Sequence, residues 1–267
     1  MRMQYLAVMT LLAGMFLGSP CAAAPAVAPS KAKQSVFQAT LETQPEPTRE
    51  LSTEEFNAFL AGKSGFVLDA RPKLEFELAH IPGSISIDET GLLRIVQTLP
   101  TPTTAIVIYS DGPFSDLAKL RARELLGMGY PNVSRYQLGL AVWRALGNTA
   151  ETSLEGFRRI FHGSGAVFID ARSRAQYAAG TIPAAETVLP GEVGHATNDR
   201  RLQYIDHATR IVVFGNSALE ARTVAEEIAR NAYPNSSFLN GTYQELKRAK
   251  FFSERKPSAS NLDGLTR

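Results

Sequence analysis

Short apolar runs alternate with amphipathic stretches along most of this chain. Two such runs, Phe66 to Asp69 and Ile106 to Tyr109, are continuous and rich in β-branched and aromatic residues. Continuous apolar runs are typical of strands buried on both faces, as in a parallel sheet covered by helices. A helical pattern from Leu117 to Met128 follows the second run and stops at Gly129, a residue type favoured just after a helix. The pattern therefore predicts an α/β fold.

The same pattern occurs twice. The segment from Phe66 to Pro82 recurs without a gap from Val167 to Pro183, at an offset of 101 residues. The run that begins at Ile106 likewise has a counterpart that begins at Ile211. A repeat of this length indicates two structural units of one kind. We predict two α/β domains in tandem, each a mostly parallel sheet flanked by helices, over residues 51–148 and 152–250, with a joint near residues 147–151.

Each copy opens on a capping pattern. Ser52 to Glu55 and Thr152 to Glu155 both place a hydroxyl three residues before a carboxylate, just ahead of an amphipathic stretch. In a capping box these two side chains satisfy free N–H groups at the start of a helix. We therefore expect a helix to begin each domain, capped by Ser52 and by Thr152.

The first residues resemble a targeting segment rather than part of a domain. Arg2 precedes a short apolar run from Tyr5 to Leu17, and small residues follow it around Cys21. A positive start, a short apolar core and small residues are typical of a cleavable secretory signal, and the run is short for a membrane span. We predict a signal peptide over residues 1–23, a flexible Ala- and Pro-rich spacer over 24–50, a polar tail over 251–267, and a periplasmic or secreted protein.

Cysteine usage follows from this prediction. Cys21 is the only cysteine of the chain, and cleavage after residue 23 would remove it. The mature protein would then have no thiol and no disulfide. Two alternatives stay open: Cys21 retained as a lipid anchor, although Pro20 before it fits that pattern poorly, or Cys21 retained and able to reach a site.

The candidate site is the loop after the second strand of the first copy. Backbone N–H groups in a strand–loop–helix connection converge and can hold a negative charge. A nucleophile would be expected where the strand ends, and Ser110 stands there, with Gly215 at the matching position of the second copy. The predicted anion-binding loop consists of Ser110, Asp111, Gly112, Pro113, Phe114 and Ser115.

Five further polar residues of the two copies are interpreted chiefly as structural. Asp69 and Asp170 end matching strands, and Arg71 and Arg172 follow two residues later. Such pairs often satisfy backbone groups of the next loop. His80 is interpreted as a donor that orders its loop, because its counterpart in the second copy is Thr181 and not a histidine.

These motifs resemble the rhodanese family in tandem, over roughly residues 51–250. The first copy has the family's Asp-x-Arg, Glu-Phe and His-Ile-Pro-Gly signatures, and its late Gly-Tyr-Pro-Asn-Val segment followed by Gly and Trp; the matching positions are Asp69, Arg71, Glu75, Phe76, His80, Ile81, Pro82, Gly83, 129–133, Gly139 and Trp143. The second copy keeps Asp170, Arg172, Tyr177, Ile182 and Pro183. The resemblance implies a sulfurtransferase fold whose catalytic cysteine carries sulfur as a persulfide.

At the position of that cysteine the chain has Ser110 and Gly215. The first loop resembles a periplasmic subgroup with Cys-Asn-Gly-Pro-x-Cys, in which both cysteines correspond to serines here, Ser110 and Ser115. Persulfide chemistry needs a thiolate. The sequence therefore favours an exported, catalytically silent binding or scaffolding module, with a small oxyanion such as sulfate, thiosulfate or phosphate in the first loop.

Two other functions stay open. An active thiosulfate or persulfide sulfurtransferase is what the family resemblance implies, and a serine-based hydrolase or phosphatase would require a base for Ser110. A net charge of +2 without a long basic run gives no reason to expect nucleic acid. Four scattered histidines match no metal-ligand spacing, so we expect no metal and no cofactor, and a partner that is an unidentified exported protein.

Overall fold

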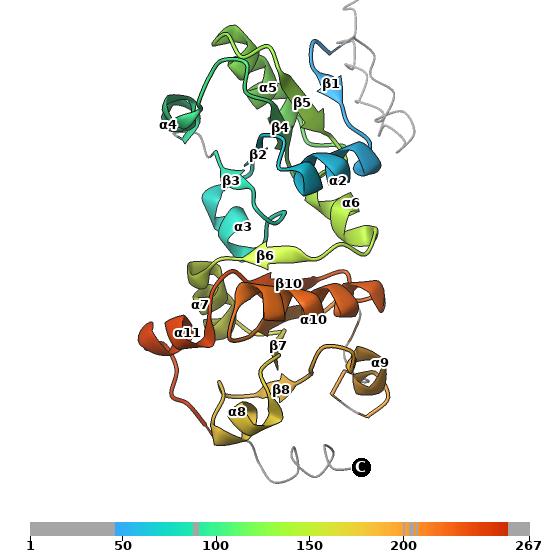
Figure 1. Ribbon diagram of the computed structural model, residues 1–267, viewed down its shortest axis with the longest axis vertical. Helices are drawn as coiled ribbons and strands as arrows, with labels where there is room; N and C mark the ends of the chain where they lie inside the picture. The colour runs from blue at the N-terminus through green and yellow to red at the C-terminus, as the bar shows by residue number, and fades with distance from the viewer. Residues whose placement is uncertain (1–45, 88–90, 200, 203–205, 207, 256–267) are drawn as a thin grey trace, which may run out of the picture. The chain divides into compact units, whose positions relative to one another are not determined.

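The computed structural model of the protein describes residues 46–87, 91–199, 201–202, 206 and 208–255. The predicted signal peptide and residues 24–45 of the predicted spacer lie outside these described residues. Figure 1 shows the order of the helices and strands along the chain.

The first domain contains five strands and five helices among the described residues. They are β1 (Arg49–Glu50), α2 (Thr53–Gly62), β2 (Phe66–Asp69), α3 (Lys73–Leu78), β3 (Ile85–Ser86), α4 (Gly91–Thr98), β4 (Ile106–Tyr109), α5 (Leu117–Gly127), β5 (Val133–Tyr136) and α6 (Gly139–Ala145).

The second domain repeats this order over its described part. Its elements are β6 (Ala150–Thr152), α7 (Leu154–His162), β7 (Ala166–Asp170), α8 (Arg174–Ala179), β8 (Ala185–Thr187), α9 (Val193–Ala196), β9 (Arg210–Phe214), α10 (Ala218–Arg230), β10 (Ser236–Leu239) and α11 (Tyr243–Arg248).

The two sheets have one topology. The strand order is β1-β5-β4-β2-β3 in the first domain and β6-β10-β9-β7-β8 in the second, and every strand pair in the described part of the chain is parallel. Parallel neighbours need crossover connections, which the helices supply. The predicted α/β fold of two tandem domains, each a parallel sheet flanked by helices, is confirmed.

Both faces of each sheet are covered. In β4, Ile106 and Ile108 pack into a core with Ala118 and Ala122 of α5, whereas Val107 packs on the opposite face in a core that includes α2 and α6. Figure 1 shows α5 beside β4 and β5. The second domain repeats this: α10 packs on one face of β9, and α7 and α11 pack on the other. This burial explains the continuous apolar runs.

Trp143 also belongs to the core of the first domain. It is 5% exposed, and its indole N–H donates to the Thr149 carbonyl at 2.9 Å. Its ring meets Phe56 and Tyr136 edge-on. The ring therefore links α6 to the segment that leads into the second domain.

One capping prediction is confirmed and one is wrong. Ser52 caps α2 and forms a complete capping box with Glu55. The cap of α7 is Ser153, whose hydroxyl accepts the Gly156 N–H, and not Thr152. Thr152 instead ends β6, and its hydroxyl donates to the Leu78 carbonyl. The sheet extends one residue further than the pattern predicts, so the helix begins one residue later.

The predicted spacer and the predicted polar tail are both partly ordered. Residues 46–50 of the predicted spacer include β1, which pairs with β5, and Thr48, which is buried and accepts a hydrogen bond from Arg135. Residues 251–255 of the predicted tail pack against the second domain, because Phe251 and Phe252 join its core. The remainder of the tail, residues 256–267, lies outside the described residues.

Each domain ends in one antiparallel β-bridge, and the two bridges lie at matching positions. The backbones of His80 and Glu151 form an antiparallel bridge, and those of Thr181 and Arg255 form the equivalent one. The segment that enters the second domain therefore occupies, on the first domain, the place that residues 254–255 occupy on the second. The repeat thus extends beyond the last helix of each copy.

Candidate functional site

The candidate site is the loop of residues 110–115, between β4 and α5. Its first residue is held by α6, because the Leu140 N–H donates to the Ser110 carbonyl at 3.0 Å. Gly139 permits this approach: its φ is +63°, and a Cβ added there would lie 2.4 Å from the Ser110 carbonyl oxygen. The start of α6 therefore fixes where the loop begins.

Three backbone N–H groups of the loop have no acceptor within the described part of the chain. The Ser115 N–H donates to the Gly112 carbonyl at 3.0 Å, and Pro113 has no N–H to offer. The N–H groups of Asp111, Gly112 and Phe114 donate to no other described residue. Amides left free in such a turn form a concavity suited to an anion.

The side chain of Ser110 is fully buried. Its Oγ has no hydrogen-bond partner among the described residues. Leaving a buried hydroxyl without a partner costs about 1–3 kcal/mol. A serine nucleophile also needs a base within hydrogen-bond reach, and no described residue supplies one to Ser110.

Beside the loop lies a buried ion pair. The Arg71 guanidinium donates to both carboxylate oxygens of Asp69, with 2.5 Å between Nη2 and Oδ2, and also to the Ala79 carbonyl at 2.7 Å. Asp69 is 0% exposed and Arg71 is 4% exposed. Burial works against the charged guanidinium, yet Asp69 raises the pKa of Arg71 above its ordinary value. Most of the hydrogen-bonding capacity of Arg71 is thus used inside the protein.

Tyr109 completes this network, and the sequence analysis did not single it out. Its hydroxyl donates to Asp69 at 2.5 Å and accepts the Ile81 N–H at 3.0 Å. Burial first, and the Asp69 charge second, raise the pKa of Tyr109 well above its ordinary value. Tyr109 reads as an ordinary apolar strand residue in the sequence, so only the fold reveals its polar role.

Two carboxylates face the mouth of the loop. The Asp111 carboxylate lies 3.9 Å from Arg71 Nη1 and is largely exposed. Burial raises the pKa of Glu75, and the neighbouring Asp111 raises it further. These negative groups oppose the binding of an external anion, whereas the free loop amides favour it.

His80 lies away from the loop and contacts the second domain. Its Nδ1 is 2.7 Å from the Phe76 carbonyl, and its Nε2 is 3.1 Å from the Glu151 carboxylate. Glu151 also accepts the Gly83 N–H and the Asn240 side-chain amide. Burial alone would raise the pKa of Glu151, but these hydrogen bonds outweigh it and lower the pKa. The sequence gives no sign of the role of Glu151, because its partner His80 is 71 residues away.

The second copy repeats the ion pair but not its surroundings. Arg172 donates to Asp170 and to the Gly180 carbonyl, as Arg71 does to Asp69 and the Ala79 carbonyl. The third donor to the aspartate is the hydroxyl of Thr181, at 2.7 Å. The Arg172 guanidinium also lies 3.4 Å from the centre of the Tyr243 ring. The pair thus recurs in the copy that has Gly215 and no nucleophile. This recurrence supports the structural interpretation of both pairs. The structural interpretation stays a prediction.

The second loop contains its own carboxylate. Glu220 accepts the Asn216 N–H, and its Oε2 lies 2.7 Å from the position that a Cβ on Gly215 would occupy. Glu220 also stands in the first turn of α10. An internal carboxylate therefore occupies the place where an external anion would approach this loop.

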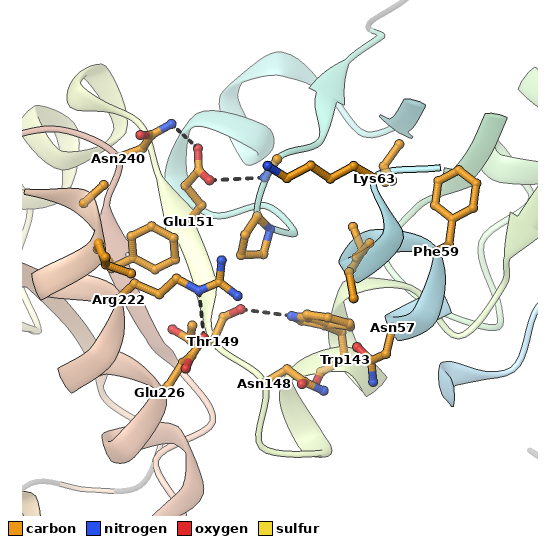
Figure 2. Close-up of a pocket in the computed structure, with 18 of the residues that line it drawn as sticks. Asn57, Phe59, Lys63, Trp143, Asn148, Thr149, Glu151, Arg222, Glu226 and Asn240 are labelled. Atoms are coloured by element: carbon orange, nitrogen blue, oxygen red, sulfur yellow. Dashed lines mark hydrogen bonds and ion pairs between the residues drawn. The ribbon is translucent and has the colours of Figure 1, made fainter. Parts of the chain in front are cut away.

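A larger cavity lies elsewhere, between α2, α10 and the segment that joins the domains. Its volume is about 1070 Å³. Figure 2 shows Trp143, Phe59 and Lys63 on one side, and Arg222 with Glu226 on the other. Arg222 forms an ion pair with Glu226, with 2.7 Å between Nε and Oε1. No residue of the predicted anion-binding loop lines this cavity.

Two general properties of the described residues complete this picture. None of the helices in the described ranges has the length and apolar character needed to cross a bilayer. Within those ranges, no three His, Cys, Asp or Glu side chains are grouped so as to hold a metal ion.

The fold and the site define a class of α/β protein with two tandem parallel-sheet domains, each with a strand-end loop beside a buried Asp–Arg pair. The model of the rhodanese-like domain matches the chain twice, at residues 52–146 and 153–249. The chain belongs to the rhodanese-like family.

Similar proteins include enzymes of sulfur transfer. The chain is 32% identical over 99 residues to the adenylyltransferase and sulfurtransferase UBA4 of Candida albicans, covering 35% of this chain and 23% of that protein. Among solved structures, a thiosulfate sulfurtransferase of Pseudomonas aeruginosa is 20% identical with a TM-score of 0.36, covering 81% of this chain and 46% of that one. The rhodanese-like domain of Anabaena Alr3790 is 22% identical with a TM-score of 0.35, covering 40% of this chain and 80% of that one. The chain thus spans less than half the length of the first two proteins.

Proposed function

We propose that this protein is an exported, catalytically silent tandem rhodanese-like protein that acts as a binding or scaffolding module. The observation that carries the proposal is the pair Ser110 and Gly215 at the two positions where the family carries its catalytic cysteine. A serine hydroxyl ionises far above neutral pH and forms no persulfide, whereas a thiolate does. The described parts of both domains keep a five-stranded sheet around these positions, which supports a purpose other than sulfur transfer.

The first loop supports binding of a small oxyanion such as thiosulfate, sulfate or phosphate. The free N–H groups of Asp111, Gly112 and Phe114 are suitable donors, and the buried Ser110 hydroxyl lacks a partner. The Asp111 carboxylate opposes this binding, and Arg71 is already committed to Asp69. The proposal therefore predicts weak binding to the natural loop.

Matched variants test this part. Thiosulfate titration at constant ionic strength, followed by backbone amide NMR, should shift the signals of residues 110–114. Asp111→Asn should strengthen the binding, and Asp116→Asn, which removes an exposed carboxylate just outside the loop, should change it less. Absence of any shift in the natural protein and in Asp111→Asn would refute oxyanion binding by this loop.

Sulfurtransferase activity is the decisive test of catalytic silence. The natural protein should transfer no sulfur from thiosulfate to cyanide. Activity that disappears in Cys21→Ser would establish the alternative in which Cys21 reaches a site. Ester hydrolysis that disappears in Ser110→Ala would establish the serine-based alternative. Export is tested separately, by identifying the first residue of the mature protein in cell fractions.

A further inference from the structure

A second pocket lies at the opposite end of the second sheet from Gly215. It is found where β7 and β9 begin, and its volume is about 420 Å³. Its polar lining residues include Arg159, Arg210, Ser164 and Thr209, and no Asp or Glu of the described part of the chain lines it. A pocket with basic and hydroxyl groups and no lining carboxylate is suited to a negatively charged ligand.

Arg210 is the cation of this pocket that is not neutralised. Arg159 forms ion pairs with Glu155, at 3.0 Å, and with Glu77, at 3.6 Å. Arg210 is half-buried and forms no ion pair or side-chain hydrogen bond with another described residue. Burial lowers the pKa of Arg210 below its ordinary value. Its guanidinium is therefore partly desolvated without a compensating carboxylate.

A second uncompensated arginine lies near it. Arg144, in α6, has its Nε and Nη2 buried with no hydrogen-bond partner in the described part of the chain. Burial, then the positive charges of Arg210 and Arg71, lower the pKa of Arg144 to about 10. The guanidinium stays charged at neutral pH. Two like charges thus lie within each other's field, and Arg144 has no anion to offset its burial.

An uncompensated buried charge is expensive, and proteins normally pair such charges. A bound anion would supply the missing countercharge of Arg210, whereas Arg144 does not line the pocket and would feel only the field of the anion. Oxyanions of phosphate and sulfate type suit a guanidinium well, because it can offer them two parallel N–H donors. The hydroxyls of Ser164 and Thr209 add possible donors on the wall of the pocket.

We propose that this pocket binds a small doubly charged oxyanion, of phosphate or sulfate type, free or as the end group of a small ester. Arg210 is the direct ligand, and Arg144 supplies a second positive charge nearby. The site is separate from the strand-end loops, so it does not rest on the function proposed above.

Trp143 offers a built-in signal for the test, because it precedes Arg144 and is the only tryptophan. The full chain is titrated with inorganic phosphate, sulfate and glycerol phosphate, at an ionic strength held constant with chloride. Tryptophan fluorescence and calorimetry follow the binding. We expect saturable binding that weakens at least tenfold in Arg210→Gln and by a smaller factor in Arg144→Gln. The control Arg230→Gln, which removes an exposed arginine outside the pocket, should bind as the natural protein does.

A second variant keeps the proposal testable if Arg144→Gln folds poorly. Arg144→Met removes the buried charge and keeps an apolar stem, so in anion-free buffer it should be at least as heat-stable as the natural protein. Phosphate should raise the melting temperature of the natural protein more than that of Arg144→Met. Tighter binding of glycerol phosphate than of inorganic phosphate would show that the pocket prefers a phosphate ester to the free anion.

Three results would overturn the proposal. These are the absence of saturable binding to the natural protein, equal weakening by Arg230→Gln, and undiminished binding to Arg210→Gln. The last result would assign the bound anion to the loop of residues 110–115 instead, which separates this site from the function proposed above.

Discussion

The imidazole of His80 and the carboxylate of Glu151 join the two domains, with 3.1 Å between Nε2 and Oε1. Both side chains are buried, and their backbones form an antiparallel bridge. Glu151 accepts two further hydrogen bonds, from Gly83 and Asn240. This one carboxylate is therefore a main polar contact of the domain interface.

The lowered pKa of Glu151 predicts that the protein becomes less stable in acid. Because its folded pKa is lower than the ordinary 4.5, its contribution is present above that pH and is lost as the pH falls through the folded pKa. Glu151→Gln should cost about 1–3 kcal/mol at pH 7, as expected when charged hydrogen bonds are removed. Much of this difference should vanish at an acid pH well below 4.5, where the carboxylate is protonated. Denaturant unfolding at both pH values measures it, with exposed Glu54→Gln as the control. An equal cost at both pH values would contradict the assignment.

Alanine substitutions at Gly139 and Gly83 distinguish the cost of close packing from the cost of backbone strain. Both have positive φ, but an added Cβ at Gly139 would meet the Ser110 carbonyl at 2.4 Å, and one at Gly83 would meet nothing within 4 Å. Gly83→Ala should cost about 1–2 kcal/mol, the cost of the left-handed conformation. Gly139→Ala should cost clearly more and displace the loop. Equal unfolding free energies of the two variants would show that α6 does not fix the loop.

Breaking the buried ion pair of either domain should lower the free energy of unfolding by a similar amount. Asp69→Asn and Asp170→Asn each leave a buried arginine without its countercharge, which costs about 3–5 kcal/mol. If the pairs are structural, both variants should lose this stability, although only the first domain has an unfilled loop. The measurement is denaturant unfolding of the two variants side by side. A large loss for Asp170→Asn only would favour a site role for Asp69.

Removing the Glu220 carboxylate should open an anion site in the second loop. Its removal in Glu220→Ala frees the Asn216 N–H, so sulfate should then shift the Asn216 amide signal in NMR, whereas it should not in the natural protein. Glu226→Ala, later in the same helix, is the control. Losing a carboxylate from the first turn of α10 should also cost about 0.3–1 kcal/mol. An unchanged Asn216 signal in Glu220→Ala would show that the carboxylate does not block an anion site.

Local pattern was sufficient to predict the fold. The apolar runs at Ile106 and Ile211, the cap at Ser52 and the stop at Gly129 depend on nearby residues, and the structure confirms each. The repeat of one pattern then implied two sheets of one kind. The boundary at Thr152 was wrong because Thr152 pairs with Leu239 of β10, far along the chain, and this pairing extends β6.

The surroundings of the candidate site were harder to predict. Tyr109 and Arg144 look in the sequence like an ordinary strand residue and an ordinary helix residue. Their roles depend on which distant groups burial brings beside them, Asp69 in one case and Arg210 in the other. Glu220 follows Gly215 by five residues, but only the structure shows that its carboxylate accepts the Asn216 N–H within the second loop.

The central claim is that neither strand-end loop can carry sulfur. Intact-mass spectrometry after incubation with thiosulfate, alongside the cyanide assay, tests it on the natural protein, Cys21→Ser and Ser110→Cys. We predict no added sulfur and no turnover for the first two, and one added sulfur atom for Ser110→Cys. Sulfur bound to, or transferred by, the natural protein would contradict the account.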